Sequence, residues 1–199
     1  MILNMDVQIR VRRSLLDAVA EVLVADPGAS LAEVAEAVGI SRTTLHNHYA
    51  TRVDLLRAVG NRVIDLWEQA IDKVEDGPDG GLRAITELLL PLCPQLAFLW
   101  RNPSFDKLPD MAERWGVAEN RGLAVLKRAQ KHGVIVASVP EWWLLGTFYS
   151  VLYVAAEMVT GGRLAPRDAP DLVLSTYLNG IGANPQPGGT DHEWAQRRS

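Results

Sequence analysis

Apolar residues recur at three- and four-residue steps in the first part of the chain, which is the spacing of amphipathic α-helices. One such stripe covers residues 7–25, and a shorter one lies in "SLAEVAEAVG" at residues 30–39. In the following "SRTTLHNHYA", Leu45 and Tyr49 supply the inward face of a third helix. A longer helix is predicted over residues 51–74, where "DGPDGG" ends it. The pattern therefore predicts four helices, with only a few residues between the second and the third.

Polar residues at the expected helix ends support these boundaries. Ser30 with Glu33, and Thr51 with Asp54, have the spacing of capping boxes. Gly39 follows the second helix, at a position where a left-handed backbone suits glycine. Two helices with so short a connection make a helix-turn-helix, although a plain helical hairpin in an all-α protein has the same spacing.

The rest of the chain is also predicted to be helical. "LRAITELLL" and "PQLAFLW" are divided into short helices by the prolines between them. A longer helix is predicted over residues 111–132, and two strongly apolar ones over residues 140–160 and 170–181. We therefore predict an all-α fold with a three-helix helix-turn-helix domain at residues 1–51, a helical domain at residues 52–183 and a flexible tail at residues 184–199.

Composition narrows the classes of function. The 199 residues carry a formal charge of −4, which argues against a nonspecific polyanion binder but says nothing of local clusters. The single cysteine, Cys93, excludes an intramolecular disulfide and a cysteine-rich zinc site, and it fits a reducing cytoplasm. The N-terminus carries its charges after its apolar residues, unlike a secretory signal, and no uncharged apolar run is long enough to predict a membrane span. We expect a cytoplasmic protein without membrane contact.

Two histidines flank one asparagine in the predicted third helix. On a strand, His46 and His48 would point to the same side, but on an α-helix they lie about 200° apart around the axis. They therefore cannot chelate one ion, and we expect neither a metal site nor a cofactor. Their polar side chains fit the outward face of a short helix that contacts another molecule.

The segment "SLAEVAEAVGISRTTLHNHYATRVDLL", with the preceding "LLDAVAEVLVAD", resembles the DNA-binding domain of the TetR family of transcriptional regulators. In that family, a third-helix segment of the form S-x-x-T-L-Y-x-H-F is followed by a small cap, a lysine and a leucine. The corresponding positions here are Ser41, Thr44, Leu45, His48, Tyr49, Thr51, Arg52 and Leu55. His46 stands where the family commonly has a tyrosine that contacts a phosphate, and a neutral imidazole still donates one hydrogen bond. The resemblance covers roughly the first 60 residues and implies a transcriptional regulator, with repression as the expected sign.

The resemblance also implies that the third helix enters the major groove of a double-stranded DNA operator. Arginine, threonine and asparagine side chains in the first turns of such a helix can reach base edges. The expected base contacts are Arg42, Thr43 and Asn47. Phosphates favour helix N-termini and polar donors, so the expected contacts to the DNA backbone are Ser30, Ser41, Thr44, His46, His48, Thr51 and Arg52. The serines and threonines also have the simpler interpretation of helix caps.

The last two long helices are apolar around more of their circumference than one core contact requires. In order, length and position they resemble the pair that forms a four-helix dimer interface in TetR-like regulators. The expected interface residues are Gly146, Ser150, Tyr153, Leu174 and Leu178. A homodimer would set two recognition helices roughly 34 to 36 Å or further apart, which suits a near-palindromic operator. The alternative is burial of both helices inside one monomer.

Aromatic and aliphatic residues are plentiful in the predicted helical domain. We expect a pocket for a small hydrophobic effector, lined by Trp67, Phe98, Trp100, Trp115, Leu123, Trp143 and Tyr149. Aromatic residues at helical spacing are also common in a plain core, so each of them keeps that second interpretation. By family resemblance, the effector would tilt the long fourth helix and weaken operator binding, on an ordinary scale of about 5- to 150-fold.

Two other functions stay open from the sequence. One is a helical enzyme acting on a hydrophobic substrate, but the chain has no HExxH, no GxSxG and no glycine-rich phosphate loop. Cys93 lies between prolines and is interpreted as a buried structural thiol, so no catalytic residue is assigned. The other is a DNA binder without an effector. The sequence favours a ligand-responsive regulator that is not an enzyme.

Overall fold

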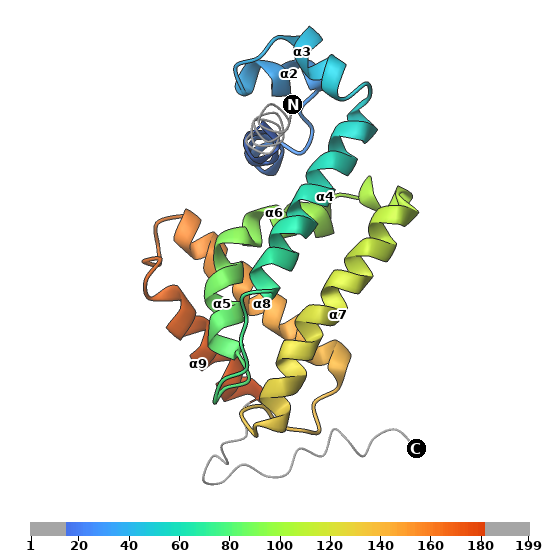
Figure 1. The fold of residues 1–199 in the computed structure, drawn as a ribbon. Helices are drawn as coiled ribbons and strands as arrows, with labels where there is room; N and C mark the ends of the chain where they lie inside the picture. Colours follow the sequence, from blue (N-terminus) through green and yellow to red (C-terminus); the bar gives the residue numbers. More distant parts are fainter. Residues whose placement is uncertain (1–14, 182–199) are drawn as a thin grey trace, which may run out of the picture.

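The computed structural model describes residues 15–181, apart from the side chains of Trp100, Arg101, Asp106 and Ile181. Over this range every regular element is a helix, which confirms the predicted all-α class. The predicted tail and the start of the first helix lie outside the described residues. Residues 15–51, here called the head, stand at one end of an elongated molecule, and the larger helical body follows (Figure 1).

The predicted helix-turn-helix forms the outer part of the head. Its helices are residues 15–25, α2 (Leu31–Ala37) and α3 (Arg42–His48). The capping box at the start of α2 is present, since Ser30 Oγ accepts from Glu33 N–H at 3.3 Å and Ser30 N–H donates to the Glu33 carboxylate at 2.7 Å. Gly39 has a φ of 73°, and Ile40 N–H donates back to the carbonyl of Ala35 at 3.0 Å. This left-handed residue ends α2 and turns the chain directly into α3.

The head has a small core of its own and is joined to the long helix that follows it by an ion pair. Its small core contains Val19, Leu23, Val34, Leu45 and Tyr49, all buried. The long helix α4 (Arg52–Ile71) then starts at the predicted capping box of Thr51 and Asp54. Within α4, Arg62 donates to both carboxylate oxygens of Asp17 at 2.7 and 3.0 Å. The first helix is therefore tied to α4 by a bidentate contact as well as by the chain between them.

The body surrounds the C-terminal part of α4. Its other helices are α5 (Leu82–Leu89), η1 (Leu90–Leu92), α6 (Cys93–Arg101), η2 (Phe105–Lys107), α7 (Pro109–Lys131), α8 (Glu141–Thr160) and α9 (Ala169–Ile181). At its centre Trp67 of α4 is fully buried, and its indole N–H donates to the carbonyl of Ala118 in α7 at 3.1 Å. Gly122 allows this approach, because a Cβ there would lie 2.8 Å from the Trp67 ring.

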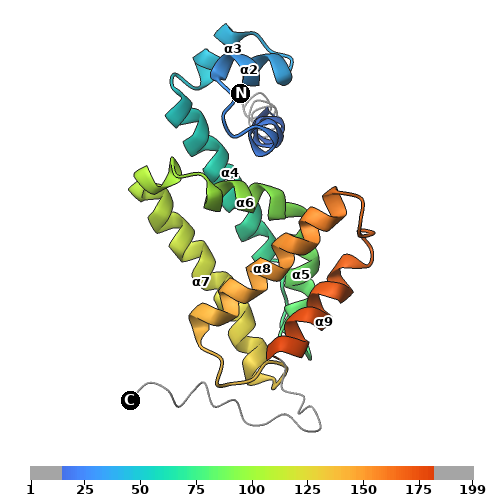
Figure 2. The same ribbon diagram turned by 180° about the vertical axis from the view of Figure 1, so that it is seen from behind.

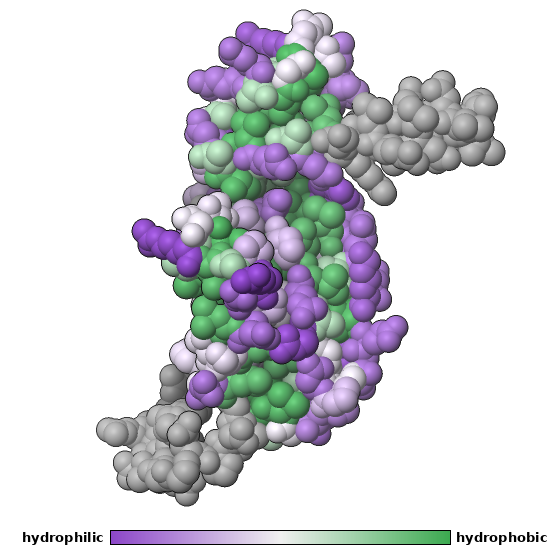
Figure 3. Space-filling model, turned by 90° about the vertical axis from the view of Figure 1, so that its left-hand side faces the viewer, coloured by the Kyte–Doolittle hydropathy of each residue, from purple (hydrophilic) through white to green (hydrophobic). Residues whose placement is uncertain are grey.

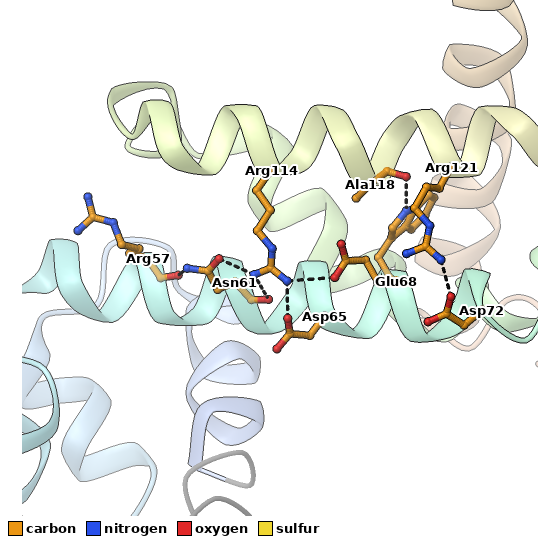
Figure 4. A network of polar contacts seen from close by, with 9 residues as sticks. Arg57, Asn61, Asp65, Glu68, Asp72, Arg114, Ala118 and Arg121 are labelled. Carbon is orange, nitrogen blue, oxygen red and sulfur yellow. Dashed lines mark hydrogen bonds and ion pairs between the residues drawn. The ribbon is translucent and has the colours of Figure 1, made fainter.

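Polar side chains join α4 to α7 beside this core contact (Figure 4). Arg114 of α7 donates to three α4 side chains, those of Asn61, Asp65 and Glu68. Further along α7, Arg121 pairs with Asp72, which follows the last residue of α4. Partly exposed pairs of this kind contribute only about 0–1 kcal/mol each, so their main effect is to fix the position of α7 along α4.

Helices α8 and α9 lie side by side on one face of the body (Figures 1 and 2). The rings of Phe148 and Tyr177 meet edge to face with centroids 5.3 Å apart, and the Tyr177 hydroxyl donates to the carbonyl of Leu144 at 3.0 Å. Other apolar side chains of the pair are left on the surface: Trp142, Trp143, Val154 and Leu172, between 48% and 73% exposed. Seen from the side on which α9 lies in Figure 1, hydrophobic side chains reach the surface in patches between polar ones (Figure 3).

Two helical stretches are long and apolar enough to span a membrane by length and composition alone, Leu82–Leu99 and Glu141–Thr160. The first is not one helix, since Pro91 and Pro94 divide it into α5, η1 and α6. The second is α8, whose Phe148 and Leu152 pack into the body. Contacts with neighbouring helices account for part of the apolar character of both stretches, since 44% of the first window and 33% of the second are buried.

Candidate nucleic-acid interface and ligand cavity

The surface of α3 is almost entirely polar and open. Only Leu45 within α3 and its cap residue Tyr49 are buried, as the spacing of apolar residues predicted. The three predicted base contacts, Arg42, Thr43 and Asn47, are all exposed. Two buried apolar residues therefore fix α3 on the head, while its outer face stays exposed and could contact a DNA groove.

Some of the predicted contacts to the DNA backbone are helix caps, and others are exposed side chains on α3. Ser41 Oγ accepts from Thr44 N–H at 3.0 Å and lies 2.8 Å from the Thr44 hydroxyl, so both residues are involved in capping α3. Ser30 and Thr51 cap α2 and α4 in the same way. His46 and His48 are exposed on α3, and no group of three or more possible metal ligands occurs in residues 15–181. Backbone N–H groups at these helix starts remain the natural phosphate donors.

Arg52 has a structural contact that its sequence position did not predict. Its guanidinium donates to the carbonyl of Pro27 at 2.6 Å and also to the carbonyl of Ala29. Both carbonyls belong to the turn between the first helix and α2. The side chain therefore fastens the start of α4 to the head, and a phosphate contact by its other N–H groups stays a prediction.

The predicted dimer residues do not share one environment. Gly146 and Ser150 are exposed on α8, and Tyr153 and Leu178 are half-buried. Leu174 is only 8% exposed and packs in the core of the monomer. The reason is the rotation of α9, which directs Val173, Leu174 and Tyr177 inward and leaves Leu172 at the surface.

The predicted pocket residues separate into different parts of the body. Trp67, Trp115 and Tyr149 meet in an aromatic cluster, with ring centroids 5.6 Å and 5.4 Å from Trp67, and Leu123 is half-buried against the same core. Trp143 is 48% exposed, packs edge to face on Trp142 and does not line the cavity described below. The side chain of Trp100 lies outside the described residues.

Phe98, the remaining predicted pocket residue, lines a cavity of about 590 Å³ between the head and the body. Its walls come from the end of the first helix, from α6 and from the C-terminal half of α8: Val24, Pro27, Pro94, Ala97, Phe98, Asn102, Tyr153, Ala156, Glu157, Thr160 and Gly161. The volume is in the usual range for small-molecule sites, and the lining is mostly apolar. Sequence patterns could not have found it, because it forms where three distant segments meet.

The pKa is raised for the buried thiol of Cys93 and for the half-buried carboxylate of Glu119. Burial raises the pKa of the Cys93 thiol to about 12, so the thiol stays protonated and is a poor nucleophile. Its sulfur lies 3.4 Å from the carbonyl of Leu89, as expected for a structural thiol. Burial also raises the pKa of Glu119, a carboxylate in the middle of α7 that sequence reasoning missed. The sequence signal that could have pointed to Glu119 is its position four residues after Trp115.

Comparison with known proteins decides the family. No protein-family model matches the chain. The transcriptional repressor LfrR of Mycolicibacterium smegmatis is 32% identical to it over 176 residues, which cover 86% of the chain and 90% of LfrR. The chain belongs to the TetR family of transcriptional regulators. NfxB of Pseudomonas aeruginosa, a helix-turn-helix transcriptional regulator, is 28% identical over 180 residues, covering 86% of the chain and 94% of NfxB. LfrR and NfxB are both transcriptional regulators, and this removes the alternative that the chain is an enzyme.

Solved structures agree with this assignment. A crystal structure of LfrR in complex with proflavine aligns with a TM-score of 0.75 at 31% identity, covering 88% of this TetR-family chain and 98% of that structure. A second LfrR structure aligns with a TM-score of 0.61 at 26% identity, covering 84% and 97%. By TM-score this chain is therefore more similar to the proflavine complex than to the second structure.

Proposed function

We propose that this TetR-family protein is a repressor that binds a near-palindromic DNA operator as a homodimer and releases it when a small hydrophobic effector binds. The observation that carries the DNA-binding part is the exposed polar face of α3, fixed on the head by Leu45 and Tyr49. LfrR, its relative, is a repressor and has been crystallised with proflavine, which supports both repression and an effector. A regulator of this kind acts where the DNA is, so the proposed location is the cytoplasm.

The proposed recognition uses α3 in the major groove. Arg42, Thr43 and Asn47 would contact base edges, while the starts of α2 and α4 would place backbone N–H groups against phosphates. His46 and His48 would each meet a phosphate or a sugar from different sides of α3. Because the chain is acidic overall, one head would bind weakly, and the affinity would come from two heads on one operator.

The proposed dimer forms through the outer faces of α8 and α9. Gly146, Ser150 and Val154 lie at four-residue steps along the exposed side of α8, and Leu172 is exposed on α9. Glycine and serine would allow two copies of α8 to approach closely, and Val154 and Leu172 would bury apolar surface. Leu174, which lies in the monomer core, is left out of this interface.

The effector is proposed to bind in the cavity between the head and the body. An occupant would touch Pro27, whose carbonyl accepts a hydrogen bond from Arg52 at the start of α4. Pressure on the Pro27 turn would therefore reach α4 through a direct contact and change the position of the head relative to the body. A coupling of this kind has an ordinary scale of about 1–3 kcal/mol, or about 5- to 150-fold in operator affinity.

The DNA-binding part is tested by selecting fragments from random duplex DNA with the full chain. The expected result is enrichment of one site with two-fold symmetry. Arg42→Ala and Asn47→Ala should then each lose about 1–3 kcal/mol of discrimination between that site and single-base variants. Enrichment of no sequence at all would contradict the function, and unchanged discrimination in both variants would contradict the base contacts.

The effector part needs a separate experiment. Hydrophobic and aromatic compounds, proflavine among them, are screened for a rise in melting temperature, and hits are tested for release of the selected operator. Ala97→Trp should fill the cavity, keep operator binding and abolish release. Release that persists in this variant would move the effector elsewhere, and a screen without hits would favour a DNA binder without an effector.

A further inference from the structure

Two arginines of α4 donate hydrogen bonds to the head from different turns of the helix. Arg52, the first residue of α4, donates to the carbonyls of Pro27 and Ala29 in the turn that follows the first helix. Arg62 donates to both carboxylate oxygens of Asp17, near the start of the described part of that helix, at 2.7 and 3.0 Å. With a rise of 1.5 Å per residue, the two attachments lie about 15 Å apart along α4. The first helix is therefore held to α4 near both of its described ends.

The contact between Arg62 and Asp17 differs in kind from the apolar packing around it. Buried side chains of the first helix and of α4, such as Leu23 and Val59, belong to one cluster of apolar contacts, and such contact is non-directional. A bidentate contact fixes distance and orientation together, because two N–H groups of the guanidinium must meet two oxygens. The Arg62 side chain is only 12% exposed, so its surroundings also limit its conformations. The pair therefore favours one angle between the first helix and α4.

This angle determines where the proposed recognition helix lies. Leu45 and Tyr49 fix α3 on the small core of the head, to which Val19 of the first helix also belongs. A rotation of the first helix against α4 therefore moves α3 as well. In the proposed homodimer the two-fold axis applies the same rotation to both heads, so the separation and the mutual orientation of the two α3 helices change together. Half-sites on DNA are separated and rotated by the helical repeat, so one head angle suits one spacing.

We propose that the Asp17–Arg62 pair is the positioning contact by which this protein selects the spacing between the two half-sites of its operator. The inference rests on the proposed function, since it requires a homodimer on a symmetric site. A partly buried ion pair contributes little net stability, and its best-established use is to specify one arrangement among several. Without the pair, each head would adopt a range of angles. Asp17 and Arg62 act through the position of α3 and are not assigned a contact with DNA.

The test measures binding to the selected operator and to two derivatives whose central spacer is one base pair longer or shorter. One base pair changes the separation of the half-sites by about 3.4 Å and their relative rotation by roughly 35°. We expect the wild type to lose at least about tenfold in affinity on each derivative. Asp17→Ala should reduce this spacing penalty to about threefold or less. A role in folding alone would weaken all three duplexes equally and leave their ratio unchanged.

Further variants show whether the pair itself is responsible. Arg62→Met removes it from the other side, which is needed because Asp65 also lies close enough to interact with the Arg62 charge. The variant with both substitutions should show the same reduced penalty as each single one, because all three remove one contact. Arg83→Met is the matched control. It breaks an exposed pair with Asp171 between α5 and α9, and it should keep the spacing penalty of the wild type.

A second measurement follows the heads without DNA. Glu36 is exposed on α2, so Glu36→Cys allows one spin label to be placed on each head of the homodimer, while Cys93 is buried and stays unlabelled. The distance between the two labels should have a narrow distribution when the pair is intact. Asp17→Ala or Arg62→Met on this background should broaden the distribution, because the heads would then adopt several angles.

Three results would overturn this inference while leaving the proposed function intact. The first is a wild type that binds its operator and tolerates both altered spacings. The second is a full spacing penalty in both single variants with normal melting curves, and the third is a label distribution that stays narrow in them. A chain that enriches no symmetric site would instead overturn the proposed function and this inference together.

Discussion

At the scale of single residues, burial of Glu119 makes stability depend on pH. Burial raises the pKa of this carboxylate in the folded protein above the ordinary value of 4.5, so the folded state favours the protonated form. The charged form therefore destabilises the fold above the folded pKa. As the pH falls through the folded pKa this cost shrinks, and below the unfolded value it is gone.

Glu119→Gln should consequently raise the melting temperature at neutral pH, and the gain should disappear in acid. The measurement is thermal unfolding of both proteins across the acidic range in the absence of ligand. Glu113→Gln, at an exposed position on the same helix, is the control and should show no comparable gain. A gain that is equal at neutral and acidic pH would mean that the charge of Glu119 is not its cause.

The sequence predicted the burial of single residues well where helical spacing determines the direction of their side chains. Leu45 and Tyr49 lie four residues apart, and both are buried as predicted, because one helix turn returns them to the same side. Arg52 differs: its partners are carbonyls more than twenty residues earlier, and no local spacing contains them. The exposure of Trp143 and the burial of Leu174 were not predicted for a related reason, since periodicity marks an apolar face but not which of two apolar faces turns inward.

At the scale of helices, the distance between α4 and α7 depends on one small residue. A Cβ on Gly122 would lie 2.8 Å from the Trp67 ring, and Trp67 has no space to move because it is fully buried. Gly122→Ala should therefore lower the free energy of unfolding by about 1–3 kcal/mol through overpacking. Urea denaturation measures this change.

Gly116 is the matched control for this prediction. It lies in the same helix, and a Cβ there would have no neighbour within 4 Å. Gly116→Ala should stabilise the protein by about 0.5–1 kcal/mol, because alanine favours the helix over the unfolded chain. If both substitutions stabilised the protein, the contact between Trp67 and Gly122 would not limit the approach of the helices.

The helices themselves were largely predictable from the sequence. Caps, prolines and glycines fixed their ends, so the expected helix over residues 111–132 is observed as Pro109–Lys131 and the one over residues 140–160 as Glu141–Thr160. The polar contacts between α4 and α7 were not predicted. Arg114 meets carboxylates about fifty residues earlier, and that pairing exists only after the helices have packed.

At the scale of the whole molecule, the candidate sites differ in how far the sequence could predict them. The proposed base-contacting surface lies on one short segment, α3, so the sequence alone could predict its exposed residues. The cavity between the head and the body combines residues from 24 to 161, and only Phe98 and Tyr153 among its walls were singled out beforehand, Tyr153 for another purpose. Sites of this kind depend on how three helices approach, which local patterns do not contain.

The proposed dimer can be tested with a charge placed on the exposed side of α8. Val154 is 55% exposed on α8, in line with Gly146 and Ser150, and an arginine there would place two charges in an apolar interface around a two-fold axis. Val154→Arg should therefore be a folded monomer by sedimentation. Its affinity for the selected operator should fall at least about 100-fold, because each head would then bind alone.

The control for this prediction is an equally exposed valine outside the proposed interface. Val117 is 59% exposed on α7, so Val117→Arg makes the same chemical change on another face and should remain a dimer with unchanged operator affinity. Circular dichroism shows whether each variant keeps its helices. A wild-type chain that sediments as a monomer, or a Val154→Arg variant that stays dimeric, would show that two copies do not meet through α8. In that case a symmetric operator would have to be bound by some other pairing of the heads.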